Sequence, residues 1–244
     1  KVATYPLSKR GAVVLGLLAF IDFIRQSVPF TTSTMSLALS LFVFSLMFIS
    51  AILTLVIRAS ADGNEGLPEA GMIDDAVEDF AGPGIALWAI GMVLFTPALI
   101  FFLQKNQVYA LGCALTAAPI LPLSAMSLTI SKGFRAVINP GVYFSLLTKT
   151  FRSYLGLLLA LAVLTSAYVG FSFLTQWAEE NLIEVFPLMF DSAFKMYIAM
   201  CSAHLVGWFI FQNHKALGYQ PKESYTDLSV GFVPSEKARE AMEH

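Results

Sequence analysis

The sequence predicts an all-α protein: a polytopic transmembrane helical bundle of about six spans, with both termini cytoplasmic. Three observations predict it: the composition, the length of the apolar runs and the placement of the basic residues. Of the 244 residues, 57% are hydrophobic and 13% are charged, and the 16 glycines raise the apolar share to roughly 64%. Soluble domains average about 45–50% apolar and about 25% charged. The composition therefore excludes an ordinary soluble enzyme and a disordered chain, and the net charge of −2 argues against nucleic-acid binding.

Runs of about 20 apolar residues are long enough to cross a bilayer core of about 30 Å as helices. Five runs reach this length on their own. The first run does so only if it continues through Arg25 and Gln26, with the Arg25 head group reaching toward the interface; a re-entrant or interfacial segment is the alternative. The predicted spans are residues 11–30, 35–57, 84–103, 108–130, 153–174 and 187–211. They form a bundle over residues 1–219, which a cytoplasmic tail follows over residues 220–244.

The basic residues predict the orientation, because Lys and Arg gather on the cytoplasmic side of membrane proteins. With six spans and a cytoplasmic N-terminus, all but Arg25, Lys105 and Lys195 fall in cytoplasmic segments, which is 12 of the 15 basic residues. An even number of spans agrees with two cytoplasmic termini. We therefore expect a multi-pass protein of the bacterial inner membrane, surrounded by membrane lipids.

The first cytoplasmic loop, residues 58–83, carries seven acids against one base, Arg58. Apolar residues recur near helical spacing over Met72–Phe80, which predicts a short amphipathic helix at the membrane surface. The loop is a candidate docking surface for a basic partner. A solvated acidic face without a partner is one alternative, and a divalent-cation site is another, although the spacing matches no calcium loop. The seven acids are Asp62, Glu65, Glu69, Asp74, Asp75, Glu78 and Asp79.

The second cytoplasmic loop contains a helix start, with Asn139 as N-cap and Pro140 at the first helical position. It predicts an interfacial helix over residues 140–152 that leads into the fifth span. Lys149 and Arg152 would lie near anionic lipid headgroups; the alternative is a lipid-anchored elbow without a regulatory role. Its apolar side carries Tyr143, Phe144, Leu147 and Phe151.

Small residues predict close helix packing, because van der Waals contact rather than hydrophobic drive holds helices together in lipid. We expect the fourth, fifth and sixth spans to form a tight group. Prolines in the third and fourth spans predict kinks or, alternatively, a cavity of the kind that transporters have. The small residues are Ala110, Ala114 and Ala118 on the fourth span, Gly156 and Ala160 on the fifth, and Ala199, Ala203 and Gly207 on the sixth; the prolines are Pro97, Pro119 and Pro122.

Four ionisable residues lie inside or beside the apolar runs: Asp22, Asp191, Lys195 and His204. They are candidate functional residues, because burying charge in a membrane is costly. Each also has a structural interpretation. Asp22 has the spacing to pair with Arg25 at i,i+3, Asp191 has the spacing to pair with Lys195 at i,i+4, and His204 is then a hydrogen-bonded structural histidine.

The sequence contains no catalytic constellation. HExxH, GxSxG, CxxC and a phosphate-cradling glycine-rich loop are all missing from the 244 residues. We therefore expect no enzyme, and the sequence assigns no catalytic, metal-binding or cofactor-binding residue and no cofactor. Cys113 and Cys201 lie in apolar runs and are interpreted as buried, unpaired side chains.

Several short motifs resemble those of a family of uncharacterised bacterial polytopic inner-membrane proteins, which is defined only as a domain of unknown function. The motifs are YPLSKRG at residues 5–11, IRASADG at 57–63, LPE at 67–69, NP at 139–140, Gly207, and ALGY at 216–219. The resemblance implies about six helices with the acidic loop on the cytoplasmic side. It implies no activity, cofactor or catalytic residue.

These observations favour a non-enzymatic membrane subunit or scaffold. Its helix faces would pack against other membrane subunits, and its acidic loop and C-terminal tail would dock cytoplasmic proteins. The alternative is a small-solute or ion transporter or channel that uses the proline-kinked spans together with Asp191, Lys195 and His204. An intramembrane enzyme is the third hypothesis, and it requires a cavity in which two ionisable groups lie within hydrogen-bond reach.

Overall fold

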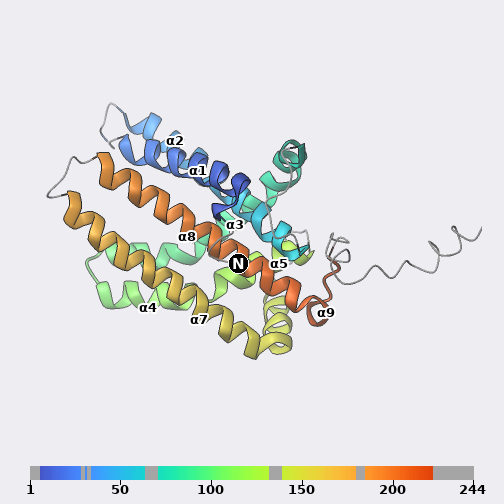
Figure 1. Cartoon of the computed structure of the whole chain (residues 1–244). Helices are drawn as coiled ribbons and strands as arrows, with labels where there is room; N and C mark the ends of the chain where they lie inside the picture. Colours follow the sequence, from blue (N-terminus) through green and yellow to red (C-terminus); the bar gives the residue numbers. More distant parts are fainter. Residues whose placement is uncertain are drawn as a thin grey trace, which may run out of the picture.

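In the computed structural model (Figure 1), the described residues are 6–28, 31, 34–63, 71–131, 139–179 and 185–221. These residues form helices and connecting turns, with no β-strand among them, which confirms the all-α class. The helices are α1 (Lys9–Ser27), α2 (Met35–Ala61), α3 (Gly71–Leu103), α4 (Gln107–Ala117), α5 (Ile120–Ser131), α7 (Pro140–Glu179), α8 (Val185–Gln212) and α9 (His214–Leu217).

Five helical stretches in the described part of the chain are long and apolar enough to cross a membrane, so the chain is a helical membrane protein. The stretches are Met35–Ala61, Gly84–Leu103, Gln107–Ser131, Pro140–Ala178 and Phe186–Gln212. They contain the last five of the six predicted spans. The helix α1 is not among them, although its 19 residues measure about 28 Å at 1.5 Å per residue. The first predicted span therefore stays a prediction.

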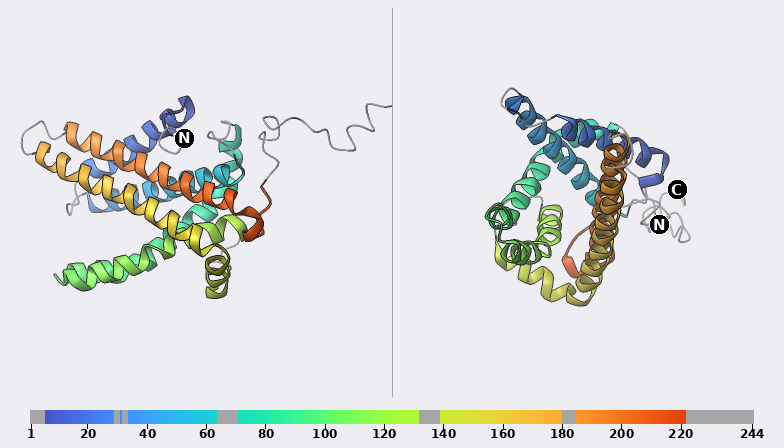
Figure 2. Two further views of the ribbon diagram at one scale, coloured as in Figure 1. Left: turned by 60° about the horizontal axis from the view of Figure 1, so that its bottom comes forward. Right: turned by 90° about the vertical axis from the view of Figure 1, so that its left-hand side faces the viewer.

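The helix α8 lies at the centre of the bundle, packed against α1, α2 and α7. About 50% of its span is buried, compared with 6% for the span in α7 and 11% for the span in α3. The α3–α4 pair diverges from the α7–α8 pair (Figure 2). The apolar core is therefore concentrated where α2, α5 and α8 meet, around the fully buried side chains of Val56, Met126, Met200 and Ile210.

The closest helix contact joins α8 to α2. A Cβ atom built on Gly207 would lie 2.5 Å from the Cβ of Ser60 and would overlap the carbonyl oxygen of Ile57. Ala203, one turn earlier, is also buried. Gly207 of the sixth span thus packs closely against the second span, which was not predicted, while the sixth span also packs against the fifth, as predicted. A sequence pattern identifies the small face of a helix, and it does not identify the helix opposite.

The other small-residue positions behave differently. Gly156 on α7 has no neighbouring atom within 4 Å of a built Cβ, so it makes no close helix contact within this chain. Ala160 beside it and Ala199 on α8 are half-buried. A second close contact, which the sequence analysis missed, places Gly84 of α3 against the backbone of Ala51 in α2.

The prolines of the fourth span break the helix as expected. The helix α4 ends at Ala117 and α5 begins at Ile120, so the span consists of two helical halves. At the break, the Tyr154 hydroxyl of α7 donates a hydrogen bond to the carbonyl oxygen of Pro119. A neighbouring helix thus supplies a polar partner where the chain changes direction. Pro97 does not end α3.

The predicted helix start at Asn139 is confirmed. Its Oδ1 atom accepts a hydrogen bond from the backbone N–H of Gly141 at 3.0 Å, and α7 begins at Pro140. Thr150 has non-helical angles (φ −128°, ψ 18°) and divides α7 into residues 140–149 and a long second part. The first turns stand at a steep angle to the rest of α7 (Figure 2).

The sequence predicts that Met72–Phe80 forms a separate short helix, and this prediction is wrong about the separation. These residues are helical, but they are the first turns of α3, which runs without interruption from Gly71 to Leu103. The spacing of apolar residues correctly predicts a helix, and Pro83 suggests a boundary. However, proline is tolerated in the first turn of a helix and costs one hydrogen bond inside it, so it does not have to end the helix.

We predict that Gly207→Ala lowers the free energy of unfolding by about 1–3 kcal/mol, because the added methyl group overpacks the α2–α8 contact. The matched control is Gly156→Ala, which faces open space. It should leave stability unchanged or raise it by up to about 1 kcal/mol, because alanine loses less backbone entropy in a helix. Unfolding of the purified protein in mixed detergent micelles, followed by circular dichroism, measures both values. Equal stability of the two variants would contradict the assigned α2–α8 contact.

Candidate functional site

The main polar site joins α1 to α8 around the carboxylate of Asp22, which is 2% exposed. Arg25 contacts Oδ1 of this carboxylate, through Nη2 at 2.7 Å and Nε at 3.0 Å. Lys195 of α8 approaches Oδ2, with its Nζ atom at 2.5 Å. Gln26 donates one hydrogen bond to Oδ2 at 2.6 Å and another to the Ser192 hydroxyl at 3.0 Å. We name these five residues the Asp22 cluster.

The predicted i,i+3 pair of Asp22 and Arg25 is confirmed. The predicted i,i+4 pair of Asp191 and Lys195 is not formed: Lys195 pairs with Asp22 on another helix, and Asp191 has no ion pair among the described contacts. The physical reason is burial. The Asp22 carboxylate lies inside the helix contact, whereas Asp191 is only half-buried. Asp191 instead lies close to Tyr168 of α7.

The Asp22 cluster places charge well inside the bundle. Lys195 lies ten residues beyond the start of α8, which is about 15 Å along the helix. One carboxylate meets two cations, and the Arg25 guanidinium also lies over the Phe42 ring of α2 at 5.5 Å. Both carboxylate oxygens of Asp22 have hydrogen-bonding or ion-pair partners, as a buried charge requires. The cluster therefore cross-links α1, α8 and α2.

A second polar contact joins α2 to α8. The Ser60 hydroxyl and Nδ1 of His204 are 2.7 Å apart, and both residues are buried. A serine and a histidine at this distance form the pair that nucleophilic catalysis uses. Here, however, Ser60 is 0% exposed and lies in the close α2–α8 contact beside Gly207. His204 is thus a buried, hydrogen-bonded residue of the α2–α8 contact, as its structural interpretation predicts.

The acidic loop is described at its beginning, residues 58–63, and from Gly71 onward, where it forms the first turns of α3. Asp62, at the end of α2, accepts a hydrogen bond from the Tyr219 hydroxyl at 2.7 Å. Burial and the neighbouring carboxylate both raise the pKa of Tyr219, so the phenol stays protonated and remains a donor at neutral pH. This contact holds the chain after α9 against the end of α2. Glu65 and Glu69 lie outside the described residues, and so do the side chains of Asp74, Asp75, Glu78 and Asp79.

The helix α5 contributes buried hydroxyl groups to the core. Ser124, Ser127 and Thr129 are each at most 2% exposed. Thr129 donates to the carbonyl of Ala125, and Ser124 also contacts the Tyr143 hydroxyl at 3.2 Å. The Ser127 hydroxyl has no partner within the part of the chain that the structure describes.

Metal ligands do not gather in the described residues: no three of their His, Cys, Asp and Glu side chains are placed to share an ion. Comparison with protein-family models, curated proteins and solved structures finds no match. Function is therefore inferred from the residues and contacts of this chain.

Sequence reasoning found Asp22, Lys195 and His204, and it missed their polar partners Gln26, Ser192 and Ser60. Ser192 and Ser60 carry no charge, and serine is common in helices that pack closely. The sequence could have identified Gln26 as a partner of Asp22, because it lies inside a predicted span and has the i,i+4 spacing from Asp22. Tyr219 lies in the quoted ALGY motif, and its position gave no indication of a contact with Asp62.

We predict that Asp22→Asn lowers the free energy of unfolding by about 1–3 kcal/mol, because Arg25 and Lys195 lose their counter-charge. The value is below the loss expected for a fully buried pair, since these two side chains are 21% and 26% exposed. Lys195→Met should be less harmful in the Asp22→Asn background than in the wild type, with a coupling energy of about 0.5–3 kcal/mol.

The measurement is a double-mutant cycle on unfolding in mixed micelles. Asp191→Asn is the control, because Asp191 forms no described ion pair, and it should change stability much less than Asp22→Asn. Strictly additive effects of Asp22→Asn and Lys195→Met would refute the cross-link.

Proposed function

We propose that this chain is a six-span protein of the bacterial inner membrane, with both termini cytoplasmic, which acts as a non-enzymatic subunit or scaffold of a membrane complex. The helix α1 is the first of these six spans. Three features support that assignment: its length of about 28 Å, its packing beside α2 and α8 (Figure 1), and the outward apolar side chains Val13, Leu17 and Phe20. Asp22 neutralises the charge of Arg25, which makes a transmembrane position less costly.

The observation that carries the scaffold role is the bare outer face of α7. Only 6% of its span is buried, and Leu155, Leu159 and Val163 are each at least half exposed along one stripe. Lipid alone satisfies such a stripe. However, Gly156 lies beside it with open space around it, and small residues let a second helix approach closely. We infer that a helix of a partner subunit packs on this face.

The cytoplasmic side supplies the second part of this proposal. The acidic loop and the C-terminal tail are the segments available for docking cytoplasmic proteins. The contact between Tyr219 and Asp62 supports a common location for the two, because it brings the beginning of the loop and the beginning of the tail together.

A transporter or channel is the second candidate function, and the structure of the fourth span favours it. Two half-helices, α4 and α5, replace one continuous span, and transporters use such discontinuous helices at their binding sites. The second half contributes the buried hydroxyls of Ser124, Ser127 and Thr129. In this candidate function, His204 and the Asp22 cluster supply the ionisable groups.

We predict that Gly156→Leu abolishes association with a stoichiometric partner, because leucine fills the approach surface on α7. Gly112→Leu is the matched control: Gly112 on α4 also has no atom within 4 Å of a built Cβ, so neither variant should disturb the fold. The measurement is purification from native membranes in mild detergent, with quantitative mass spectrometry of the co-purified chains.

Retention of the partner by Gly156→Leu, or its loss from both variants, refutes the α7 interface. A monodisperse wild-type protein that has no partner and that moves a solute across liposome membranes would establish the transporter alternative instead.

The orientation is tested with single cysteines in a chain whose Cys113 and Cys201 are replaced by serine. We predict that Lys105→Cys is labelled by a membrane-impermeant maleimide added to intact cells, whereas Gly218→Cys is labelled only after lysis. Cysteine at Ser8 should behave like Gly218→Cys if α1 spans the membrane. Labelling at Ser8 in intact cells would leave five spans and a reversed N-terminus.

A further inference from the structure

The start of α7 has three distinct faces. Val142, Leu146 and Thr150 face the bundle, where Leu146 and Thr150 are buried and Val142 packs against the core. Phe144 and Phe151 form an exposed apolar face, at 69% and 53% exposure. We name residues 140–152 the elbow, because the kink at Thr150 turns the chain within it.

The third face of the elbow is polar and basic. Ser145, Lys149 and Arg152 follow one another at i, i+4 and i+7, and all three are exposed. The i,i+4 spacing places Ser145 and Lys149 on one side of the first segment, and Arg152 follows directly after the kink at Thr150. They lie next to the phenylalanine face, so the solvent-exposed surface of the elbow is amphipathic.

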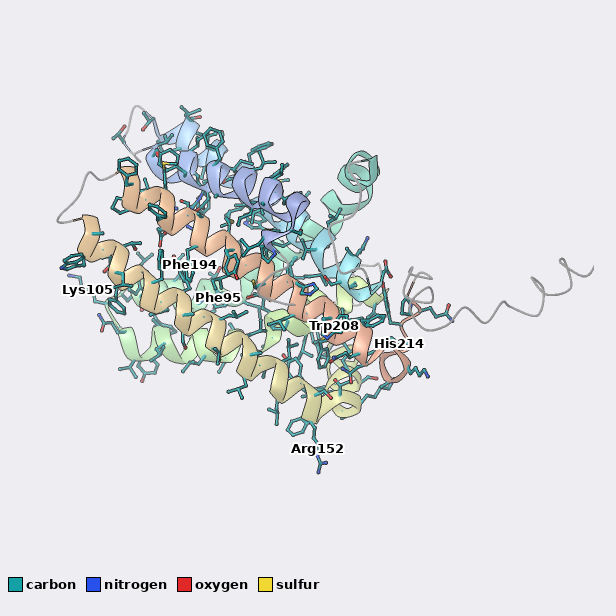
Figure 3. All side chains as sticks on the ribbon, viewed as in Figure 1. Phe95, Lys105, Arg152, Phe194, Trp208 and His214 are labelled. Carbon is teal, nitrogen blue, oxygen red and sulfur yellow. The ribbon has the colours of Figure 1, made fainter. Side chains whose placement is uncertain are left out.

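The sequence of α7 up to Ala178 contains no acid that balances this charge. Between Asn139 and Ala178 the sequence contains Lys149 and Arg152 and no Asp or Glu. Neither cation forms an ion pair among the described residues. The short helix α9, which packs against α7, adds the exposed Lys215 at the same end of the bundle. In Figure 3 the Arg152 side chain projects away from the helices.

We propose that Lys149 and Arg152 bind the phosphate of an anionic phospholipid, with Phe144 and Phe151 against its acyl chains. A helix that lies in the membrane interface places its aromatic side chains at the acyl boundary and its Lys and Arg side chains at the headgroups. The arginine fork suits a phosphate oxygen pair, and the lysine adds a point charge. The adjoining phenylalanine face selects a lipid over a soluble acidic ligand.

This lipid site goes beyond the scaffold role and does not depend on it, since it requires only that the elbow lies at the membrane surface. The steep angle between the first turns of α7 and its spanning part (Figure 2) suits a position along the membrane surface. The bundle-facing residues of the elbow hold it in place, so the basic face is already oriented before a lipid arrives.

The test measures phosphatidylglycerol binding to the full chain in nanodiscs of otherwise zwitterionic phosphatidylcholine. The retained lipid is counted by native mass spectrometry after release from the disc. We expect Lys149→Gln and Arg152→Gln each to weaken phosphatidylglycerol retention about fivefold, and the double variant about 25-fold, because each surface cation contributes a factor of that size. Lys149→Arg should retain the lipid, and added salt should weaken its binding.

Lys105→Gln is the matched control, because Lys105 is an exposed lysine at the other end of the bundle, after α3. It should leave retention unchanged. Thermal unfolding in neutral detergent checks that all variants are folded, which their exposure leads us to expect. Wild-type retention by the double variant would overturn the proposal. So would equal retention of phosphatidylcholine, or an equal effect of Lys105→Gln. Partner co-purification is measured separately, so failure of the lipid site leaves the scaffold proposal intact.

Discussion

Lipid offers no hydrogen bonds, so every polar group on a spanning helix must find its partner within the protein. In this chain α8 carries polar groups whose partners lie on two other helices, and the arrangement of the bundle follows from where those partners lie. Ser192 and Lys195 meet Gln26 and Asp22 of α1, and His204 meets Ser60 of α2. These contacts place α1 and α2 on α8, which is why α8 is the most central of the helices described here.

Close backbone contact reinforces the same arrangement. Gly207 lets α8 approach α2 near Ser60, so the serine–histidine hydrogen bond and the glycine contact occupy neighbouring turns. A larger residue at Gly207 would separate the two helices and would also lengthen the hydrogen bond. Dispersion contacts and a buried polar pair thus depend on one another at this interface.

The other side of the molecule has few such contacts. The helix α7 packs along α8, for example where the Phe171 ring meets the Phe194 ring, and its Tyr154 hydroxyl contacts the break between α4 and α5. The outer face of α7 is apolar and bare. Polar contacts therefore hold the centre of the chain together. The outer face of the peripheral helix α7 is exposed and can contact lipid or another subunit. The elbow connects the two regions.

The sequence by itself determined the helical class, five of the spans, the break at Pro119 and the start of α7 at Asn139, because these depend on local length, apolar character and backbone chemistry. It also found Asp22 and Lys195, since charges stand out in apolar runs. Only the tertiary structure decided that Lys195 pairs with Asp22 and not with Asp191, and that Gly207 contacts α2 while Gly156 contacts nothing. Spacing within one helix fixes which residues share a face, whereas the partner of that face depends on how helices distant in sequence pack together.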